Sequence, residues 1–190
     1  MSDRTQAHTA ALLSAIARKD RRALGELIAV HGRGLTLVAT RYLGSPEDAD
    51  EVIQDVFLRV WRHASKYDPQ KARVKTWLYR ITVNLCIDRH RRMSLRRFIG
   101  LDDPPVEIAD PQPSAADRLE DRHTLDTVRA AIAALPARQR MALLLSAVAE
   151  LDTNDVATAM AISPGAVEQL LVRARRKLRA ATTQNEDQTT

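Results

Sequence analysis

Cysteine, glycine and aromatic residues are scarce in this sequence of 190 residues. Cys86 is the only cysteine, so a disulfide within the chain is excluded and a metal site built from cysteines is not expected. Glycine occurs six times, aromatic side chains make up only 4% of the residues, and runs of β-branched residues are short. Because Ala, Leu and Arg dominate instead, the composition favours helices over strands.

Long apolar runs are also missing. No stretch approaches the roughly 20 apolar residues that are needed to cross a bilayer. The first 20 residues contain neither the apolar segment nor the small-residue cleavage site of a secretion signal. We therefore expect a cytoplasmic protein that does not insert into a membrane.

The residue groups that carry catalysis are not found either. The sequence has no His and Asp paired around a nucleophile, no cluster of metal ligands and no glycine-rich phosphate loop. We expect neither an enzyme nor a bound cofactor. The histidines are scattered, and each is interpreted as a surface residue or a hydrogen-bonded one; they stand at positions 8, 31, 63, 90 and 123.

Basic residues are in excess, with a formal net charge of +5 and a pI of about 9.8. Such a charge suggests an anionic partner, most often a nucleic acid, although it says nothing about the fold.

The chain divides into two helical regions and a linker. Residues 8–97 show successive helical periods, residues 98–115 hold four prolines and no helical period, and residues 116–181 return to helix. Residues 182–190 are expected to form a disordered tail. The predicted fold is all-α, with two small helical domains joined by a flexible acidic linker, the second domain containing a helix-turn-helix.

The acidic linker has three interpretations. Its carboxylates could be solvated, could occupy a positively charged channel in a partner, or could screen the basic regions on either side. The acids are Asp102, Asp103, Glu107 and Asp110.

Helix boundaries in the first region are marked by familiar residues. A break is expected near Asp20, and Gly44 marks the end of the helix that follows. Ser45 can cap the next helix, with Pro46 at its first position.

The helix predicted over residues 46–64 has two distinct faces. Its core face is predicted to hold Ala49, Val52, Ile53, Val56, Phe57 and Val60. The opposite face carries Leu58 and Trp61 among charged residues, which is typical of an interface with apolar anchors and a polar rim. The alternative is that Trp61 folds onto a neighbouring helix.

The helix predicted over residues 75–92 has a core stripe of Leu78, Ile81 and Leu85. An adjoining stripe combines aromatic, amide and guanidinium groups, which suits single-stranded DNA because bases stack on aromatics and phosphates bind arginines. The equally open alternative is that Trp77 belongs to the core and the arginines are solvated. This second stripe consists of Trp77, Arg80, Asn84, Asp88 and Arg91.

Residues 151–179 predict a helix-turn-helix, a motif whose second helix enters the major groove. Asp152 and Asp155 suit the start of a short helix, and Ser163 can cap a longer one with Pro164 at its first position. The alternative is an ordinary helical hairpin. The inward residues of the longer helix are predicted to be Val167, Leu171, Ala174 and Leu178.

Together these motifs resemble a known family. The segments DADEVIQDVFLRVWRH, KTWLYRITVNLCIDRHRR, ALPARQRMALLL and VATAMAISPGAVEQLLVRARRKLR, in this order around a linker, are similar to bacterial RNA polymerase sigma factors of the extracytoplasmic-function (ECF) type. The resemblance covers roughly residues 10–181. It implies a dissociable factor that binds core RNA polymerase and promoter DNA, in a stress or envelope response, and that is restrained by an anti-sigma factor.

The resemblance assigns residues 8–97 to sigma region 2, residues 116–181 to sigma region 4, and a function to each of three surfaces. The first surface would bind the polymerase clamp: Glu51, Gln54, Asp55, Leu58, Trp61 and Arg62. The second would open and hold the minus-ten element: Lys66, Lys75, Trp77, Arg80, Asn84, Arg89, Arg91 and Arg92. The third would read the minus-thirty-five element: Glu168, Gln169, Val172, Arg173, Arg175 and Arg176.

The sequence departs from the family pattern at residues 166–170, where many members carry a Thr-Val-Lys/Arg-Ser-Arg run. Glu168 and Gln169 could read cytosine and adenine and so change the promoter, or upstream contacts could be weak and rest on the later arginines.

A self-sufficient helix-turn-helix regulator is the alternative function. It predicts a dimerisation surface and tight binding to duplex DNA alone, and it leaves Leu58, Trp61 and Trp77 unexplained.

Overall fold

The computed structural model describes residues 3–98 and 128–186, and every regular element in these ranges is a helix. The prediction of an all-α fold is therefore confirmed. The predicted acidic linker lies outside the described residues, apart from its first residue. The first region contains α1 (Asp3–Ala17), α2 (Arg21–Leu43), α3 (Pro46–His63), the 3-10 turn η1 (Ala64–Lys66) and α4 (Val74–Phe98).

The second region contains α6 (Ala137–Ala147), α7 (Thr153–Met160) and α8 (Pro164–Glu186). Residues 128–133 are helical as well. Because α8 continues to Glu186, the last helix extends beyond the boundary at residue 181 that the sequence predicts. Among the described helices, none combines the length and the apolar character that a bilayer crossing needs.

Local sequence chemistry explains where the first helices begin and end. The Asp20 carboxylate accepts hydrogen bonds from the amides of Arg22 (2.8 Å) and Ala23 (3.2 Å), and so caps α2. Gly44 ends α2 in the left-handed conformation with φ of 75°, which glycine adopts without steric cost. The Ser45 hydroxyl then accepts from the Asp48 amide at 3.1 Å, which confirms the predicted cap of α3.

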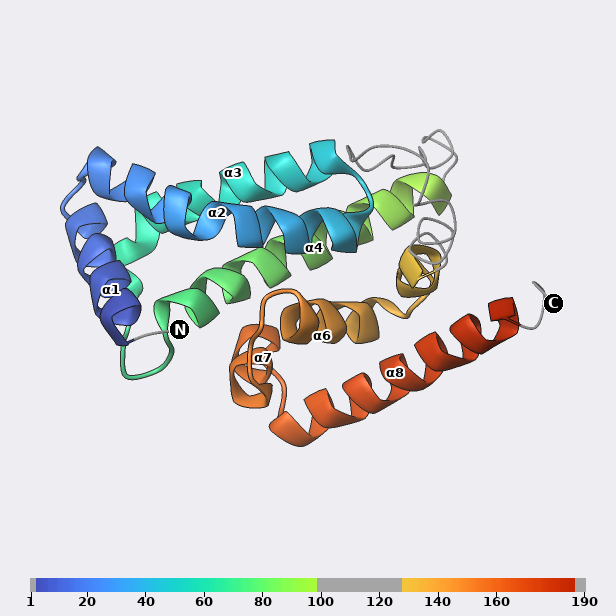
Figure 1. Cartoon of the computed structure of the whole chain (residues 1–190). Coiled ribbons are helices and arrows are strands. Elements are labelled where there is room, and N and C mark those ends of the chain that lie inside the picture. Colours follow the sequence, from blue (N-terminus) through green and yellow to red (C-terminus); the bar gives the residue numbers. More distant parts are fainter. Residues whose placement is uncertain (1–2, 99–127, 187–190) are drawn as a thin grey trace, which may run out of the picture.

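The helices of the first region pack side by side. In Figure 1, α2 and α3 run alongside α4, and α1 stands at one end of this group. The predicted core face of α3 is confirmed, since five of its six residues are buried and Ile53 is partly buried. Helix α4 is buried on more sides than its predicted stripe, because Tyr79, Val83 and Cys86 are buried too.

The second region packs directly on the first. Helix α7 contacts α4, α6 contacts α2, and α8 runs along the far side of α6 (Figure 1). One continuous apolar core crosses this junction, with Tyr42 and Leu78 from the first region and Met141 and Val156 from the second. The predicted helix-turn-helix is therefore held against the helix that carries the second surface.

Candidate nucleic-acid and protein interfaces

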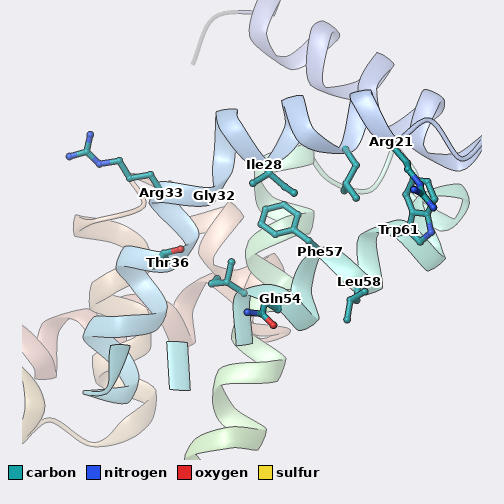
Figure 2. Close-up of a pocket in the computed structure, with 11 residues that line it drawn as sticks. Arg21, Ile28, Gly32, Arg33, Thr36, Gln54, Phe57, Leu58 and Trp61 are labelled. Atoms are coloured by element: carbon teal, nitrogen blue, oxygen red, sulfur yellow. The ribbon is translucent and has the colours of Figure 1, made fainter. Parts of the chain in front are cut away.

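An apolar groove of about 820 Å³ runs between α2 and α3. Ile28 on α2 is 39% exposed and Leu58 on α3 is 48% exposed, although both are large apolar side chains. Figure 2 shows the Phe57 ring beneath Ile28, with Leu58 and Trp61 farther along α3. Water-exposed apolar walls of this kind are typical of a surface that a partner covers.

Trp61 combines the two roles that the sequence offers, an exposed anchor of an interface and a side chain packed onto its neighbours. Its ring is partly buried and packs against the core, and the Lys19 ammonium lies 5.1 Å from the ring centre. Lys19 also donates a hydrogen bond to the Trp61 carbonyl at 3.1 Å. Trp61 still lines the groove, so it both folds onto its neighbours and faces the open side. The rest of the first surface is exposed: Glu51, Gln54, Asp55 and Arg62.

Trp77 on α4 is also partly buried. Its ring forms a T-shaped contact with the ring of Tyr67 at a centroid distance of 5.6 Å, and the Tyr67 hydroxyl donates to the Ala72 carbonyl at 3.1 Å. These contacts fasten the loop before α4 to the helix. The remaining members of the second surface, apart from Arg89 and the half-buried Lys75, are exposed: Lys66, Arg80, Asn84, Arg91 and Arg92.

Arg89 forms ion pairs with two carboxylates of the protein itself. Its Nε donates to the Asp48 carboxylate at 2.6 Å, its Nη2 forms an ion pair with the same carboxylate, and its Nη1 lies 2.6 Å from Glu51 Oε2. Burial by itself would lower the pKa of the Arg89 guanidinium, but the hydrogen bonds to Asp48 and Glu51 outweigh it and raise that pKa. Arg89 thus ties α4 to α3, and its contact with DNA stays a prediction.

The second region has the geometry of a helix-turn-helix. Asp152 caps α7 by accepting from the Asp155 amide at 2.8 Å, and Ala161 turns the chain in the left-handed conformation with φ of 53°. The Ser163 hydroxyl accepts from the Ala166 amide at 3.3 Å and caps α8. The predicted caps by Asp152 and Ser163 and the predicted turn are therefore confirmed, whereas Asp155 does not act as a cap with its side chain among the described residues.

The two sides of α8 separate as predicted. Val167, Leu171 and Ala174 are buried, and Leu178 is partly buried. Leu170 is also partly buried against the core, so the position where many family members carry Arg faces inward here. Val172 is 60% exposed. The other members of the third surface are exposed as well: Glu168, Gln169, Arg173, Arg175 and Arg176.

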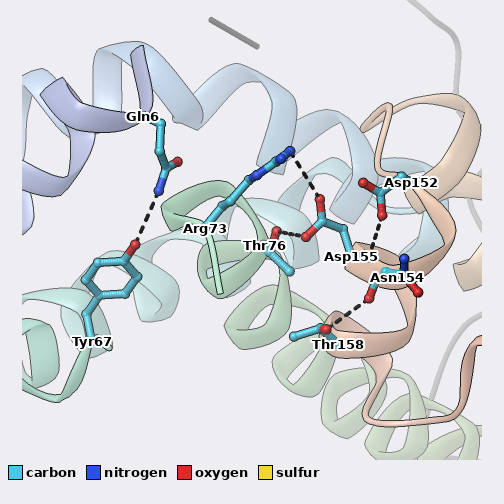
Figure 3. A network of polar contacts seen from close by, with 8 residues as sticks. All are labelled: Gln6, Tyr67, Arg73, Thr76, Asp152, Asn154, Asp155 and Thr158. Atoms are coloured by element: carbon cyan, nitrogen blue, oxygen red, sulfur yellow. Dashed lines mark hydrogen bonds and ion pairs between the residues drawn. The ribbon is translucent and has the colours of Figure 1, made fainter. Parts of the chain in front are cut away.

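A polar contact between α4 and α7 is absent from the sequence predictions. The Thr76 hydroxyl donates to Asp155 Oδ1 at 2.6 Å, and Arg73 Nη1 lies 3.9 Å from Asp155 Oδ2 (Figure 3). We call these three residues the α4–α7 joint. The sequence suggests Asp155 as part of an acidic cap, but its carboxylate points across to α4, and Asp152 alone supplies the side-chain cap among the hydrogen bonds of the described residues. No feature of the neighbouring sequence shows whether the Asp155 carboxylate caps its own helix or contacts α4.

Arg140 makes a second connection between the regions. Its guanidinium carbon lies 5.0 Å from the centre of the Tyr42 ring, and its Nη2 lies 3.3 Å from His90 Nε2. Tyr42 is fully buried, and burial raises the pKa of its hydroxyl. An arginine over the face of a buried aromatic ring is a stabilising arrangement.

His31 on α2 corrects the sequence interpretation of the histidines. Only 8% of it is exposed, and its Nε2 has no hydrogen-bond partner among the described residues. Burial, and secondarily the charge of Lys75, lower the pKa of His31 to about 4. His31 is therefore neither on the surface nor satisfied at that nitrogen, and it is neutral at pH 7.

The cysteine and the most deeply buried tyrosines of the described ranges lie in the core and do not form a reactive site. Burial raises the pKa of Cys86 and of Tyr79 to about 12. Across residues 3–98 and 128–186, no group of three or more His, Cys, Asp or Glu side chains is arranged to hold a metal ion.

Comparison with protein families identifies both regions. The family model for Sigma-70 region 2 matches residues 27–96, and the model for Sigma-70 region 4 matches residues 125–178. Among curated proteins, the ECF RNA polymerase sigma factor SigM of Mycobacterium tuberculosis is 34% identical, with 92% of this chain and 85% of SigM covered. The RNA polymerase sigma factor CnrH of Cupriavidus metallidurans is 31% identical, with 89% of this chain and 91% of CnrH covered.

Solved structures give the same result. The structure of CnrH in complex with the cytosolic domain of CnrY superimposes with a TM-score of 0.68 and 26% identity, covering 91% of this chain and 96% of CnrH. RpoE in complex with the anti-sigma factor NepR, from Bartonella quintana, also has a TM-score of 0.68, covering 84% of this chain and 96% of RpoE. Its identity of 20% supports the fold alone.

Proposed function

The chain belongs to the ECF group of sigma-70 RNA polymerase sigma factors. We propose which of its surfaces binds the polymerase and which bind promoter DNA. A sigma factor is a non-enzymatic initiation factor. It binds core RNA polymerase, directs it to promoters and dissociates, while core polymerase carries out synthesis. The self-sufficient regulator is not favoured, because the first region matches a sigma domain over residues 27–96.

The first surface binds core polymerase in this proposal. The groove beside Leu58 and Trp61 offers apolar anchor positions, and its lining also includes Arg21 and Arg33. The exposed carboxylate of Asp55 lies on the same helix as Leu58 and Trp61. Apolar anchors among charged residues suit a partner protein that offers apolar side chains and complementary charges. The polymerase clamp is the partner that we assign to it.

The second surface handles the opened minus-ten element. Exposed Asn84 can read a base edge, the partly exposed Trp77 ring can stack on a base, and Arg91 and Arg92 can contact phosphates. Arg89 takes part only if DNA displaces Asp48 and Glu51, so we assign it a structural role in the free protein.

The third surface reads the minus-thirty-five element in the major groove. Glu168 and Gln169 lie exposed in the first two turns of α8, where recognition helices contact bases. Glu168 suits a cytosine and Gln169 an adenine, and exposed Val172 can pack against a thymine methyl group. We propose a changed promoter preference rather than loss of upstream recognition.

An anti-sigma factor restrains the protein in this proposal. CnrH, which is 31% identical, has been solved bound to the cytosolic domain of CnrY. We extend that kind of partner to this chain and place its contact on the groove between α2 and α3. An apolar segment seated there would exclude the polymerase clamp by covering Leu58.

The domain limits follow the same scheme. We propose that residues 8–97 form sigma region 2, that residues 98–115 pass through the polymerase as an acidic linker, and that residues 116–181 form sigma region 4. We place the protein in the cytoplasm, where the polymerase acts.

One observation carries the proposal, namely the presence in one chain of an exposed apolar groove between α2 and α3 and a helix-turn-helix with an exposed basic face. The test mixes the purified protein with core RNA polymerase and genomic promoter fragments and sequences the transcripts. Initiation at sites that share an upstream motif is expected. Failure to bind core polymerase would contradict the proposal, and binding without initiation would contradict the roles of the DNA surfaces.

A further inference from the structure

The α4–α7 joint brings a carboxylate to the start of a long helix. Thr76 is the third residue of α4, in the first turn, where backbone amides lack intrahelical acceptors and the helix dipole favours anions. Thr76 is fully buried, and its hydroxyl donates to Asp155 Oδ1 at 2.6 Å. Arg73, directly before the helix, lies 3.9 Å from the other carboxylate oxygen. An anion therefore already sits at this helix end.

That anion belongs to a segment 79 residues away in the sequence. Helix α7 does not need the Asp155 carboxylate as a cap, because Asp152 provides one. The Asp155 side chain instead spans the junction between the two sigma regions (Figure 3). A charged hydrogen bond of this length is among the stronger polar contacts in a protein.

The groups that hold Asp155 are also groups that bind DNA phosphates. Hydroxyls, guanidinium groups and helix N-termini make up much of the phosphate contacts in protein–DNA complexes. The joint borders the second surface, since Lys75 and Trp77 are the neighbours of Thr76 in the first turn of α4. Arg80, one turn along α4, lines a cleft of about 390 Å³ together with Thr158 of α7 and Pro164 of α8.

The joined arrangement is incompatible with reading both promoter elements. The positions of the minus-ten and minus-thirty-five elements place them about 25 base pairs apart, which corresponds to about 85 Å of B-form DNA at about 3.4 Å per base pair. In the structure, the first helix of the helix-turn-helix is hydrogen-bonded to the helix of the second surface. The two regions must therefore separate before the protein can contact both elements.

We propose that Arg73 and Thr76 form a seat for a phosphate of the melted promoter strand, and that Asp155 fills this seat while the protein is closed. The inference rests on the proposed function and adds a regulated contact to its second surface. The Asp155 carboxylate and the DNA phosphate compete for one hydroxyl and one guanidinium. Closure therefore excludes the single strand, and opening exposes the seat.

The test uses the full chain and a fluorescently labelled single-stranded oligothymidine of 20 nucleotides. Phosphate contacts carry no sequence information, so the probe does not need to contain a promoter. Fluorescence anisotropy gives the affinity, and small-angle scattering gives the radius of gyration. Asp155→Ala removes the competing carboxylate, and Asp50→Ala removes an exposed carboxylate from α3 as the matched control.

Asp155→Ala is expected to bind the probe about tenfold more tightly, because the closed state loses a charged hydrogen bond while the apolar core still joins the two regions. Any change in the radius of gyration should be an increase, since the loss shifts the equilibrium toward the open state. Asp50→Ala should match the wild type in both measurements. In the Asp155→Ala background, Thr76→Val should weaken binding about tenfold, and Thr76→Ser should restore it. In that background, Arg73→Ala should reduce the salt dependence by about one phosphate contact.

Two outcomes would overturn the inference. If Asp155→Ala changes neither the affinity nor the radius of gyration, the carboxylate does not compete with the strand. If it opens the protein but Thr76→Val and Arg73→Ala leave probe binding unchanged, the seat does not bind phosphate.

Failure of the proposed function would look different. In that case neither the wild type nor any variant would support initiation by core polymerase, whatever the oligothymidine data show. A wild type that initiates normally, combined with an unresponsive Asp155→Ala variant, would refute the seat alone.

Discussion

Replacing His31 tests whether a buried, unpaired histidine limits the stability of the first region in acid. The His31→Leu variant keeps a side chain of similar bulk in α2 and removes the titrating group. The folded protein holds His31 neutral with a pKa of about 4, whereas an unfolded histidine has a pKa of about 6.5. Below pH 6.5 the unfolded state therefore binds more protons than the folded state, and acid favours unfolding.

The two pKa values set the size of the effect. A shift of one pKa unit corresponds to about 1.4 kcal/mol, so His31 is expected to cost the folded state about 2 kcal/mol at pH 5 and about 3 kcal/mol at pH 4. At pH 7 the cost is only about 0.2 kcal/mol, because both states are then mostly neutral. The stability that depends on neutral His31 is thus present above pH 6.5, is lost progressively as the pH falls from 6.5 to 4, and falls little further below pH 4.

Urea unfolding at pH 7, 6, 5 and 4 measures the free energy of unfolding of each protein. The difference between His31→Leu and the wild type should grow by about 2 kcal/mol between pH 7 and pH 5. The comparison at each pH cancels the titration of carboxylates that both proteins share. His63→Gln, which alters an exposed histidine, should follow the wild type at every pH. If the wild type and His31→Leu lose stability in parallel, His31 is not the group that carries the acid sensitivity.

Three further predictions concern the surfaces. Leu58→Ala should weaken binding to core polymerase about tenfold or more, whereas Leu37→Ala, a matched truncation of an exposed leucine outside the groove, should leave it unchanged in a pull-down titration. Arg89→Ala should lower the free energy of unfolding by about 2 kcal/mol, and a double-mutant cycle with Asp48→Ala that gives no coupling energy would contradict the ion pair. Arg176→Ala should weaken binding to a duplex promoter and reduce the salt slope by about 0.9, and a slope equal to that of the wild type would exclude a phosphate contact.

Local chemistry allowed much of the fold to be predicted. Capping residues act on the amides two or three positions away, so Asp20, Ser45 and Ser163 mark helix starts without knowledge of the tertiary fold. Helical periodicity likewise separates the buried and exposed sides of α3 and α8, because side chains four residues apart lie on one face. The exposed state of Leu58 follows from that same rule.

Capping and helical periodicity do not predict contacts between residues that are far apart in the sequence. Arg89 looks like the other arginines of its cluster, yet only Arg89 lies where Asp48 of α3 can reach it, 41 residues earlier in the sequence. His31 resembles any histidine on a helix until α2 packs and buries it. Trp61 is half-buried because its ring packs against the core, and Lys19, from the turn between α1 and α2, lies over that ring.

The sequence by itself determined the helices, the order of the two sigma regions and the chemical character of the three surfaces. These follow from periodicity, capping and motif order, which depend on residues close together in the chain. Only the tertiary structure decided which charged and polar groups are already engaged. Thr76 and Asp155 are 79 residues apart, and no local pattern specifies that α4 of the first region and α7 of the second will meet. Packing of two apolar faces into one core brings them together, and that contact determines which polar groups are paired inside the protein and which stay exposed.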